Sequence, residues 1–366
     1  MKQNTVRSLA LLSLVLTSSV VAQSTAVNIG LVFDPAGKYD HGINQAVNDG
    51  LERATQDFGV SVSSYTPVDA ADAAAKLASY AGDNQLVIGV GHFNVAGVSK
   101  LAASAPRTHF AVVDDLPKGS NTMGIRFREN EGAFMAGYIA GSTSSTSVVG
   151  IVMPAGAGST PFVSAYRAGT KLVCPNCKVL VGTLNGSGDD TASAEAVSKT
   201  LLKQGADILF VGATSGKLGV ISAVRSQQCF KASALPAGVK FNQDVFAKVP
   251  KAQDYQGRCG AQSRPVFFIG WESDYLSLGD TDADAGTLNT GLTAIVKRAD
   301  NAVYSLIDAV VKKRAWRPGD NGFGFQNAGL EVAINKYNEA LFDKAMLGRL
   351  KTVQGLIKSG SVRLGD

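Results

Sequence analysis

The chain lacks the features that mark membrane-spanning and nucleic-acid-binding proteins. After its first 26 residues, no apolar run in the 366-residue sequence reaches the length of a transmembrane helix. A strong charge of either sign is also missing, because 35 Lys and Arg stand against 30 Asp and Glu and give a formal net charge of +5. This mild, dispersed excess argues against nucleic acid and against a charged membrane surface as partners.

Motifs for catalysis are equally scarce. The sequence has no Gly-x-Ser-x-Gly elbow, no His-Glu-x-x-His pair and no Ser, His and Asp set. His41 and His109 are isolated and form no metal set. We therefore expect no catalytic residue, no metal and no cofactor.

The first 26 residues have the pattern of an export signal. Lys2 and Arg7 precede an apolar stretch at Leu9–Val21, and small residues before Gln23 and before Val27 offer cleavage sites. Cleavage would remove these two positive charges and lower the net charge from +5 to +3. Since no Cys lies near the boundary to carry a lipid, we expect a soluble, exported protein on the periplasmic or extracellular face.

Four cysteines follow this segment, and export permits disulfides. Of the three possible pairings we favour Cys174–Cys177 with Cys229–Cys259, because each closes a local loop. The Cys-Pro-Asn-Cys motif precedes an expected strand, so a structural staple fits it better than a redox role, which needs a helix N-terminus. A zinc site from all four is a minor alternative. Residues 227–264 are interpreted as a surface insertion held by the second disulfide.

Strand and helix patterns alternate from Val27 to the C-terminus. Short apolar runs rich in Val, Ile and Phe are typical of strands buried on both faces of a parallel sheet. Strands are expected at 27–33, 60–65, 85–90, 110–113, 123–127, 148–153, 178–184, 207–211, 266–270, 288–293 and 330–334. Helices are expected at 44–58, 131–141, 165–173, 192–204, 217–225, 293–312 and 335–350. These βα repeats predict an α/β fold with doubly wound sheets.

The repeats fall into two successive sets, which predicts two lobes. We expect residues 27–128 plus 273–314 in the first lobe and residues 129–272 plus 315–366 in the second. Several chain crossings between lobes of this kind make a hinge, with a ligand cleft between the lobes.

The segment at residues 30–45 is the strongest candidate for a ligand site. An apolar strand leads into a polar turn and a helix, and loops at the carboxyl ends of strands bind ligands in such folds. Polar side chains gather there within eleven residues: Asp34, Lys38, Asp40, His41 and Asn44. Two alternatives stay open, that Asp34 only bonds its own turn and that Asn44 is only a helix N-cap.

The same segment resembles the DxGGxDDKSFNQ signature of the basic membrane protein (PnrA-like) family, the nucleoside receptors of ABC importers. Further segments match in the family's order: His109–Asp114, Glu131–Ala140, Val149–Val152 with Pro161–Gly169, Gly205–Ile208 with Gly216 and Gly219, Ile269–Asp274, and Leu292–Arg298 around Lys297. The resemblance spans nearly the whole chain after the signal and implies a type I periplasmic-binding-protein fold.

The resemblance also implies a purine nucleoside site between the lobes. The implied contacts are Asp34, Asn44, Asp114, Asp115, Gly216, Glu272 and Lys297. Asp34 and Asn44 would bond the base or the ribose. Glu272 and Lys297 would hold the ribose hydroxyls, since a carboxylate accepts from a diol and an ammonium donates to it. Lys297 falls in an expected helix, so a merely charged helix face is its alternative role.

Three positions depart from the family pattern. Ile43 stands where the family has a stacking Phe, which removes a ring–ring contact worth about 1 kcal/mol. Glu272 replaces a shorter Asp, and Trp271 replaces Val. Trp271 or Phe93 would then supply the missing aromatic face, and these departures bear on the ligand rather than on the fold.

The function implied is a monomeric binding protein that captures a nucleoside and presents it to an ABC permease by closing its lobes. Two alternatives are a sensor subunit that signals to a membrane receptor and an exported nucleoside hydrolase. For the hydrolase, Asp34, Asp40 and Asp114 would form a metal-binding carboxylate cluster.

Overall fold

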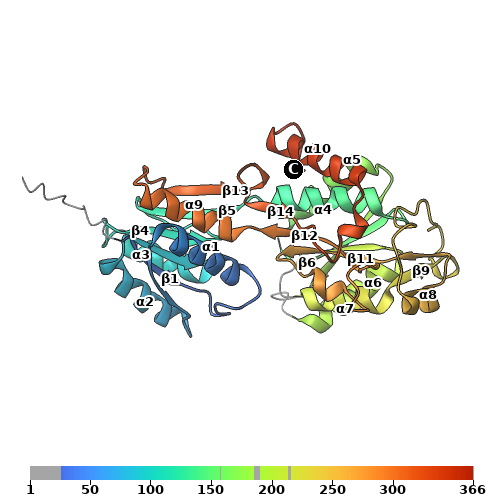
Figure 1. Cartoon of the computed structure of the whole chain (residues 1–366), viewed down its shortest axis with the longest axis horizontal. Coiled ribbons are helices and arrows are strands. Elements are labelled where there is room, and N and C mark those ends of the chain that lie inside the picture. The colour runs from blue at the N-terminus through green and yellow to red at the C-terminus, as the bar shows by residue number, and fades with distance from the viewer. Residues whose placement is uncertain (1–25, 157, 185–189, 213–215, 366) are drawn as a thin grey trace, which may run out of the picture.

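The computed structural model describes residues 26–156, 158–184, 190–212 and 216–365. The expected export signal therefore lies outside the described residues, apart from Ala26. Two α/β lobes lie side by side along the long axis of the molecule (Figure 1). Each contains a six-stranded sheet covered by helices.

The first lobe is built on a fully parallel sheet with strand order β13-β5-β4-β3-β1-β2. Its strands are β1 (Asn28–Val32), β2 (Ser61–Tyr65), β3 (Leu86–Val90), β4 (His109–Val113), β5 (Thr122–Phe127) and β13 (Gly319–Phe323). Its helices are α1 (Ile43–Phe58), α2 (Ala70–Asp83), α3 (Val95–Ala102) and α9 (Ala299–Val311). Helix α1 packs beside α9, while α2 and α3 share a separate apolar cluster with the sheet. All five residues of β3 are buried, as an inner strand covered on both faces requires.

The second sheet has the order β14-β12-β11-β8-β6-β7, with β14 antiparallel to β12. Its strands are β6 (Val148–Pro154), β7 (Lys178–Leu184), β8 (Ile208–Val211), β11 (Phe267–Glu272), β12 (Gly291–Lys297) and β14 (Leu330–Val332). Its helices are α4 (Glu129–Thr143), α5 (Ser159–Val173), α6 (Thr191–Lys203), α7 (Lys217–Gln227) and α10 (Lys344–Lys358). Short 3₁₀ turns lie at η1 (His92–Asn94), η2 (Ala232–Ala234), η3 (Leu276–Gly279), η4 (Phe325–Asn327) and η5 (Glu339–Leu341).

Helices α4 and α5 approach closely because glycines face each other at their contact. A Cβ on Gly137 would lie 2.0 Å from the Tyr166 carbonyl oxygen, and one on Gly169 would lie 1.9 Å from that of Phe134. No side chain fits at either position. The two glycines therefore let the backbones of α4 and α5 come into direct contact.

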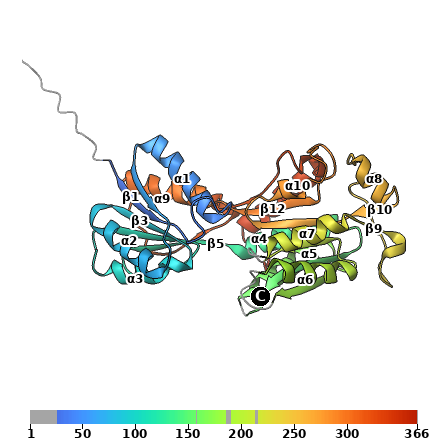
Figure 2. The same cartoon turned by 90° about the horizontal axis from the view of Figure 1, so that it is seen from below.

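The insertion after α7 contains β9 (Cys229–Lys231), α8 (Gln253–Cys259) and β10 (Ser263–Pro265). It lies at the end of the second lobe that is farthest from the first lobe (Figure 2). Cys229 is bonded to Cys259, and Cys174 to Cys177 at the end of α5, so the favoured pairing is confirmed.

Two strands lie in a different sheet from the one expected. Strand β12 belongs to the second sheet, between β11 and β14, although residues 273–314 were expected in the first lobe. Strand β13 belongs to the first sheet, although residues 315–366 were expected in the second. An apolar run shows that a strand is buried but not which sheet buries it, since pairing is decided by crossovers distant in sequence. The expected helix at 293–312 begins only at Ala299, so Lys297 ends a strand.

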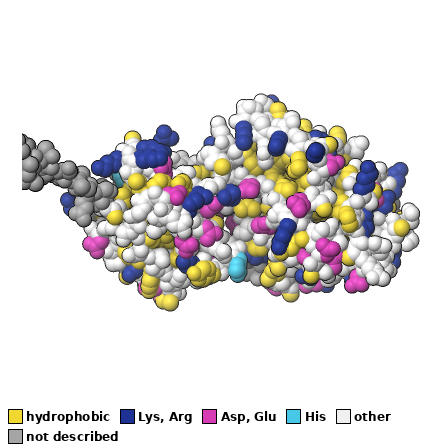
Figure 3. Space-filling view, viewed as in Figure 1, with side chains coloured by type: hydrophobic (Ala, Val, Ile, Leu, Met, Phe, Trp, Pro, Cys, Tyr) yellow, Lys and Arg dark blue, Asp and Glu magenta, His cyan; other side chains and the backbone are white. Residues whose placement is uncertain are grey.

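The described chain passes between the lobes after β5, after β12 and after β13. Space-filling shows a narrow waist there, with acidic and basic side chains around it (Figure 3). The Arg128 N–H donates to the Phe323 carbonyl at 2.8 Å, and the Arg298 N–H donates to that of Gly329 at 2.9 Å. The crossing segments are thus bonded to one another.

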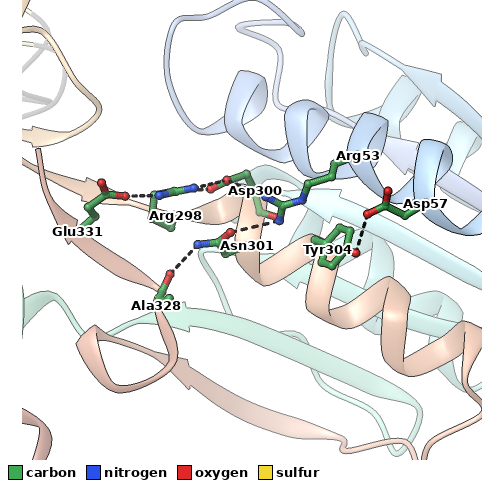
Figure 4. A network of polar contacts seen from close by, with 8 residues as sticks. All are labelled: Arg53, Asp57, Arg298, Asp300, Asn301, Tyr304, Ala328 and Glu331. Carbon is green, nitrogen blue, oxygen red and sulfur yellow. Dashed lines mark hydrogen bonds and ion pairs between the residues drawn. The ribbon is translucent and has the colours of Figure 1, made fainter. Parts of the chain in front are cut away.

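Side chains reinforce the crossing at Arg298 (Figure 4). Its guanidinium donates to both oxygens of Asp300, at 2.8 and 2.7 Å, and pairs with Glu331 of β14. Asp300 also faces Arg53 of α1 at 3.7 Å. The network therefore ties α1 and the start of α9 in the first lobe to β14 in the second.

Candidate functional site

The centre of the candidate site is Lys297, whose side chain is only 3% exposed at the end of β12. Its Nζ lies 2.9 Å from Asp114 Oδ2, 3.0 Å from Glu272 Oε1 and 2.7 Å from Glu129 Oε1. Asp114 follows β4 in the first sheet, Glu272 ends β11 in the second, and Glu129 begins α4 at a crossing. This four-residue cluster, the Lys297 cluster, therefore joins both lobes.

The Lys297 cluster contains one basic group and three acidic groups. Burial alone would lower the pKa of Lys297, but Glu272, Asp114 and Glu129 outweigh it and raise that pKa well above its ordinary value. Burial raises the pKa of Asp114 to about 6, although Lys297 opposes this shift. One ammonium donates to three carboxylates, and each carboxylate has several acceptor positions. The cluster is therefore suited to a neutral ligand that offers several hydrogen-bond donors.

Two of the carboxylates sit on unusual backbone. Asp114 has φ 68° and Glu272 has φ 69°, the left-handed region that favours glycine. Each such residue costs about 1 to 2 kcal/mol, and residues of this kind gather at ligand sites. Both acids directly follow or end a strand, so the same backbone feature occurs at corresponding edges of the two sheets.

Further polar groups line the edge of the first sheet. Asp34 follows β1, His92 follows β3 and Asp115 follows β4, and these strands are neighbours. The His92 Nδ1 lies 2.6 Å from Asp115 Oδ2. Asp34 Oδ1 accepts from the Ala36 N–H at 3.0 Å, so Asp34 also stabilises its own turn.

Asn44 is fully buried and positions the loop after β1. Its Oδ1 accepts from the Asp34 N–H at 3.1 Å, and its Nδ2 donates to the Asp34 carbonyl at 3.4 Å. The helix-cap alternative is wrong, because the Asp40 carboxylate accepts from the N–H groups of Gly42, Asn44 and Gln45 instead. Asp40 therefore caps α1 through its side chain.

The aromatic side chains near the site differ in availability. Trp271 is 4% exposed and packs edge-on against Phe162 and Phe210, with ring centroids 4.9 and 6.1 Å apart. Its ring lies 5.4 Å from Lys297 Nζ, so Trp271 supports the cluster from the core and offers no open face. Phe93 is half-buried against the apolar cluster that α2 and α3 share with the first sheet. Ile43 is half-buried against the main hydrophobic core.

Tyr39 was not predicted as a ligand contact. Its side chain is 71% exposed and therefore available to a ligand. It lies in the loop between β1 and α1, which extends toward the second lobe in both views (Figures 1 and 2). Lys38 lies 5.2 Å from its ring and pairs with Glu52 at 3.1 Å. The only indication of this in the sequence is that Tyr39 lies within the polar segment between Asp34 and Asn44.

A pocket of about 550 Å³ adjoins the cluster between the lobes. Asp114, Asp115 and Arg126 line it from the first lobe, and Gly158 and Pro161 from the second. Its size is in the range of small-molecule sites.

Gly216 lies at a different edge, at the N-terminus of α7 after β8. Its carbonyl accepts from the N–H groups of Gly219 and Val220. The residues directly before it, 213–215, lie outside the described part of the chain.

Comparison with known proteins decides the family. Residues 26–246 match the family model described as ABC transporter substrate-binding protein PnrA-like. The chain belongs to this family. The nucleoside-binding protein BmpA of Lactococcus lactis is 26% identical over 345 residues, which cover 91% of this chain and 89% of BmpA. The CD4+ T-cell-stimulating antigen of Listeria innocua is 25% identical over 350 residues, covering 92% and 88%.

Solved structures show the same fold. A solute-binding protein of an ABC transporter from Aeropyrum pernix superposes with a TM-score of 0.66 at 20% identity, covering 92% of each chain. A transcriptional activator of the comK gene from Bacillus halodurans superposes with a TM-score of 0.70 at 18% identity, covering 91% of this chain and 99% of the activator. The fold is that of type I periplasmic binding proteins, and the predictions of family and fold are confirmed.

The PnrA-like protein is thus an ABC transporter solute-binding protein, with a small-molecule ligand and a permease partner, and it is not an enzyme. Within the described ranges, no group of His, Cys, Asp and Glu is arranged to hold a metal. The carboxylates of Asp34, Asp40 and Asp114 bond separately to a turn, a helix end and Lys297. No described helix has the length and apolarity needed to cross a membrane.

Proposed function

We propose that this PnrA-like protein binds a purine nucleoside between its lobes and delivers it to a permease after export. The observation that carries the proposal is the Lys297 cluster, in which acceptors from both lobes meet around one ammonium. A ribose diol supplies two donors to such acceptors and accepts from an ammonium. The name of BmpA supports a nucleoside as the solute.

Lobe closure follows from the same arrangement. Asp114 belongs to the first lobe, while Glu272 and Lys297 belong to the second. A ligand that bonds to both sets of groups favours the conformation that brings them together. Asp34 follows β1, which is separated from β4 by β3 in the first sheet, and we expect it to bond the base or the ribose.

The deciding experiment is calorimetric titration with inosine, guanosine and adenosine, each beside its 2′-deoxy analogue. We expect micromolar or tighter binding, and at least tenfold weaker binding of the deoxy form, because a charge-assisted hydrogen bond is lost and its protein partner is left unpaired. Asp34→Ala and Lys297→Ala should each weaken binding at least tenfold.

The matched control is Lys199→Ala, since Lys199 forms an exposed ion pair with Glu195 on α6. Unchanged affinity in both Asp34→Ala and Lys297→Ala would refute the assigned site. Native mass spectrometry of the purified protein, compared with a denatured sample, would identify a retained ligand. A retained solute that is not a nucleoside would refute the proposed specificity.

A further inference from the structure

The first lobe contains a second cavity, at the end of its sheet opposite to the candidate site. The cavity has a volume of about 690 Å³, within the range of small-molecule sites. His109 begins β4, and Val27 and Gln85 immediately precede β1 and β3, so the cavity lies at the amino ends of the strands. The Lys297 cluster lies at their carboxyl ends. We call this cavity the amino-end groove.

The body of the groove is apolar. Helix α9 forms one wall, and strands β5 and β13 form the other. The apolar side chains that line it are Met123, Ile125, Leu306, Val310 and Phe323. Met123 and Phe323 are only partly buried, so the groove leaves apolar surface in contact with water. Covering this surface with an apolar ligand is favourable, at about 25 cal/mol per Å².

Two polar atoms in the groove have no partner among the described residues. The Trp316 indole stacks on the His109 imidazole, with ring centroids 4.2 Å apart and an interplanar angle of 9°. Trp316 Nε1 and His109 Nδ1 are both buried without a hydrogen bond. Burial lowers the pKa of His109, which keeps its ring neutral at pH 7. A buried N–H without a hydrogen bond is unfavourable, so a ligand oxygen that accepts from the Trp316 Nε1–H would be stabilising.

The rim of the groove is basic. Arg107, Lys313, Arg314 and Arg317 line it, and none of the described lining residues is acidic. Arg314 is neutralised by Asp308 from the side of α9. The described part of the chain gives Arg107, Lys313 and Arg317 no ion pair. An anionic group is therefore the complement of this rim.

We propose that the amino-end groove binds a small amphipathic carboxylate, such as a medium-chain fatty acid in its free form. The apolar chain lies along α9 against Met123 and Phe323. The carboxylate accepts from the Trp316 Nε1–H and faces the cations of the rim. The site is independent of the solute cleft, and its occupant binds by charge and apolar contact together.

The test is calorimetric titration of the full chain with decanoate, octanoate and decyltrimethylammonium. We expect micromolar binding of decanoate, about tenfold weaker binding of octanoate because two methylene groups are lost, and no binding of the cation. Ala309→Trp should abolish decanoate binding by filling the groove. Trp316→Phe keeps the ring stack but removes the N–H, and should weaken decanoate binding about fivefold.

Two further variants separate the rim from general charge. Arg107→Gln with Arg317→Gln should weaken decanoate binding about fivefold, whereas Lys248→Gln, an exposed lysine of the insertion, should change nothing. Nucleoside affinity in each variant reports whether the fold is intact. Equal binding of decanoate and decyltrimethylammonium, or decanoate binding that survives Ala309→Trp, would overturn the proposal. Adsorption of the protein to anionic or neutral vesicles without binding of free decanoate would also overturn it. The same holds if the protein is a dimer in solution and Ala309→Trp converts it to a monomer.

Discussion

Lys297 Nζ lies 2.9 Å from Asp114 Oδ2, and this ion pair connects the end of a strand in one lobe with the end of a strand in the other. Lys297 belongs to the second sheet and Asp114 follows the fourth strand of the first. A relative movement of the lobes therefore changes the surroundings of both groups. Binding, protonation and lobe closure are coupled at this contact.

Lys297→Gln is expected to destabilise the protein by about 3 kcal/mol, because three carboxylates would lose the buried cation that neutralises them. Urea unfolding measures the change. Lys199→Gln, at an exposed pair, should cost less than about 1 kcal/mol. Adding Glu272→Gln to Lys297→Gln should recover part of the loss, since it removes one repelling charge. A double variant no more stable than the single one would show that repulsion is not the cause.

Nucleoside affinity is expected to fall as the pH drops from 7 to 5. Burial raises the pKa of Asp114 to about 6, so Asp114 takes up a proton in this range and ceases to be a full acceptor. Linkage then predicts about tenfold weaker binding at pH 5, with no change above pH 7. Asp114→Asn should bind weakly and with a flat pH profile. An unaltered profile in that variant would assign the titration to another group.

Tyr39 is 71% exposed in the loop between β1 and α1, and we expect its ring to stack on the nucleoside base. Tyr39→Ala should then weaken nucleoside binding about fivefold, through loss of a ring contact worth about 1 kcal/mol. Tyr39→Phe keeps the ring and should bind like the original protein. Val68→Ala is the control, because Val68 is 83% exposed but outside the loop between β1 and α1. Equal effects of Tyr39→Ala and Val68→Ala would argue against stacking.

Asp207→Ala is expected to destabilise the second lobe by about 3 kcal/mol. Asp207 is 1% exposed and accepts from the Ser144 hydroxyl and from the N–H groups of Ser145 and Thr146, which would lose their partner. Asp190→Ala removes only an exposed helix cap on α6 and should cost about 1 kcal/mol. Thermal and urea unfolding compare the two.

The pH dependence of stability gives Asp207 a second test. Burial raises its pKa to about 6, above about 4 in an unfolded chain, so the folded state binds more protons between these values. The part of its contribution to stability that comes from this pKa shift is therefore full below about pH 4 and is lost as the pH rises through 6. The stability difference between the original protein and Asp207→Ala should widen from pH 7 to pH 5. A constant difference would contradict the shifted pKa.

Removal of the Cys229–Cys259 disulfide by a double Ser substitution is expected to cost about 3 kcal/mol, because the bond closes a loop with a sequence separation of 30. The Cys174–Cys177 bond spans a separation of only 3 and should contribute about 2 kcal/mol or less. Urea unfolding of the two double variants compares them. Equal losses would mean that strain or packing outweighs loop closure.

Local patterns were sufficient where burial is continuous along a segment or repeats with the period of a helix. The buried run at β3 and the apolar stripe of α1 follow directly from spacing, and both lie where the sequence predicted them. The Ala-rich helix α2 was missed, although Ala73, Leu77 and Tyr80 form a buried stripe at helical spacing. The short edge strand β13 was missed because Gly319, Asp320 and Asn321 have low strand propensity.

The sequence predicted only part of the candidate site. Lys297 and Glu272 were predicted as ligand contacts, but the left-handed backbone at Asp114 and Glu272 and the approach of Glu129 have no local signal. Asn44 and Trp271 carry the residue types of a binding site, yet the fold buries both. Burial alone does not separate the two roles, since Lys297 is equally buried but contacts carboxylates from both lobes. The partners of a side chain decide its role, and these partners are a property of the folded chain.

The sequence by itself determined the alternation of strands and helices, the disulfide pairing by proximity and the family. These depend on residues near one another along the chain, whose spacing directly limits backbone geometry. The tertiary structure alone decided that β12 joins the second sheet, that Lys297 meets three carboxylates and that Tyr39 is exposed. These relationships join residues up to 183 positions apart, and only the packing of the whole chain brings such residues within a few ångströms.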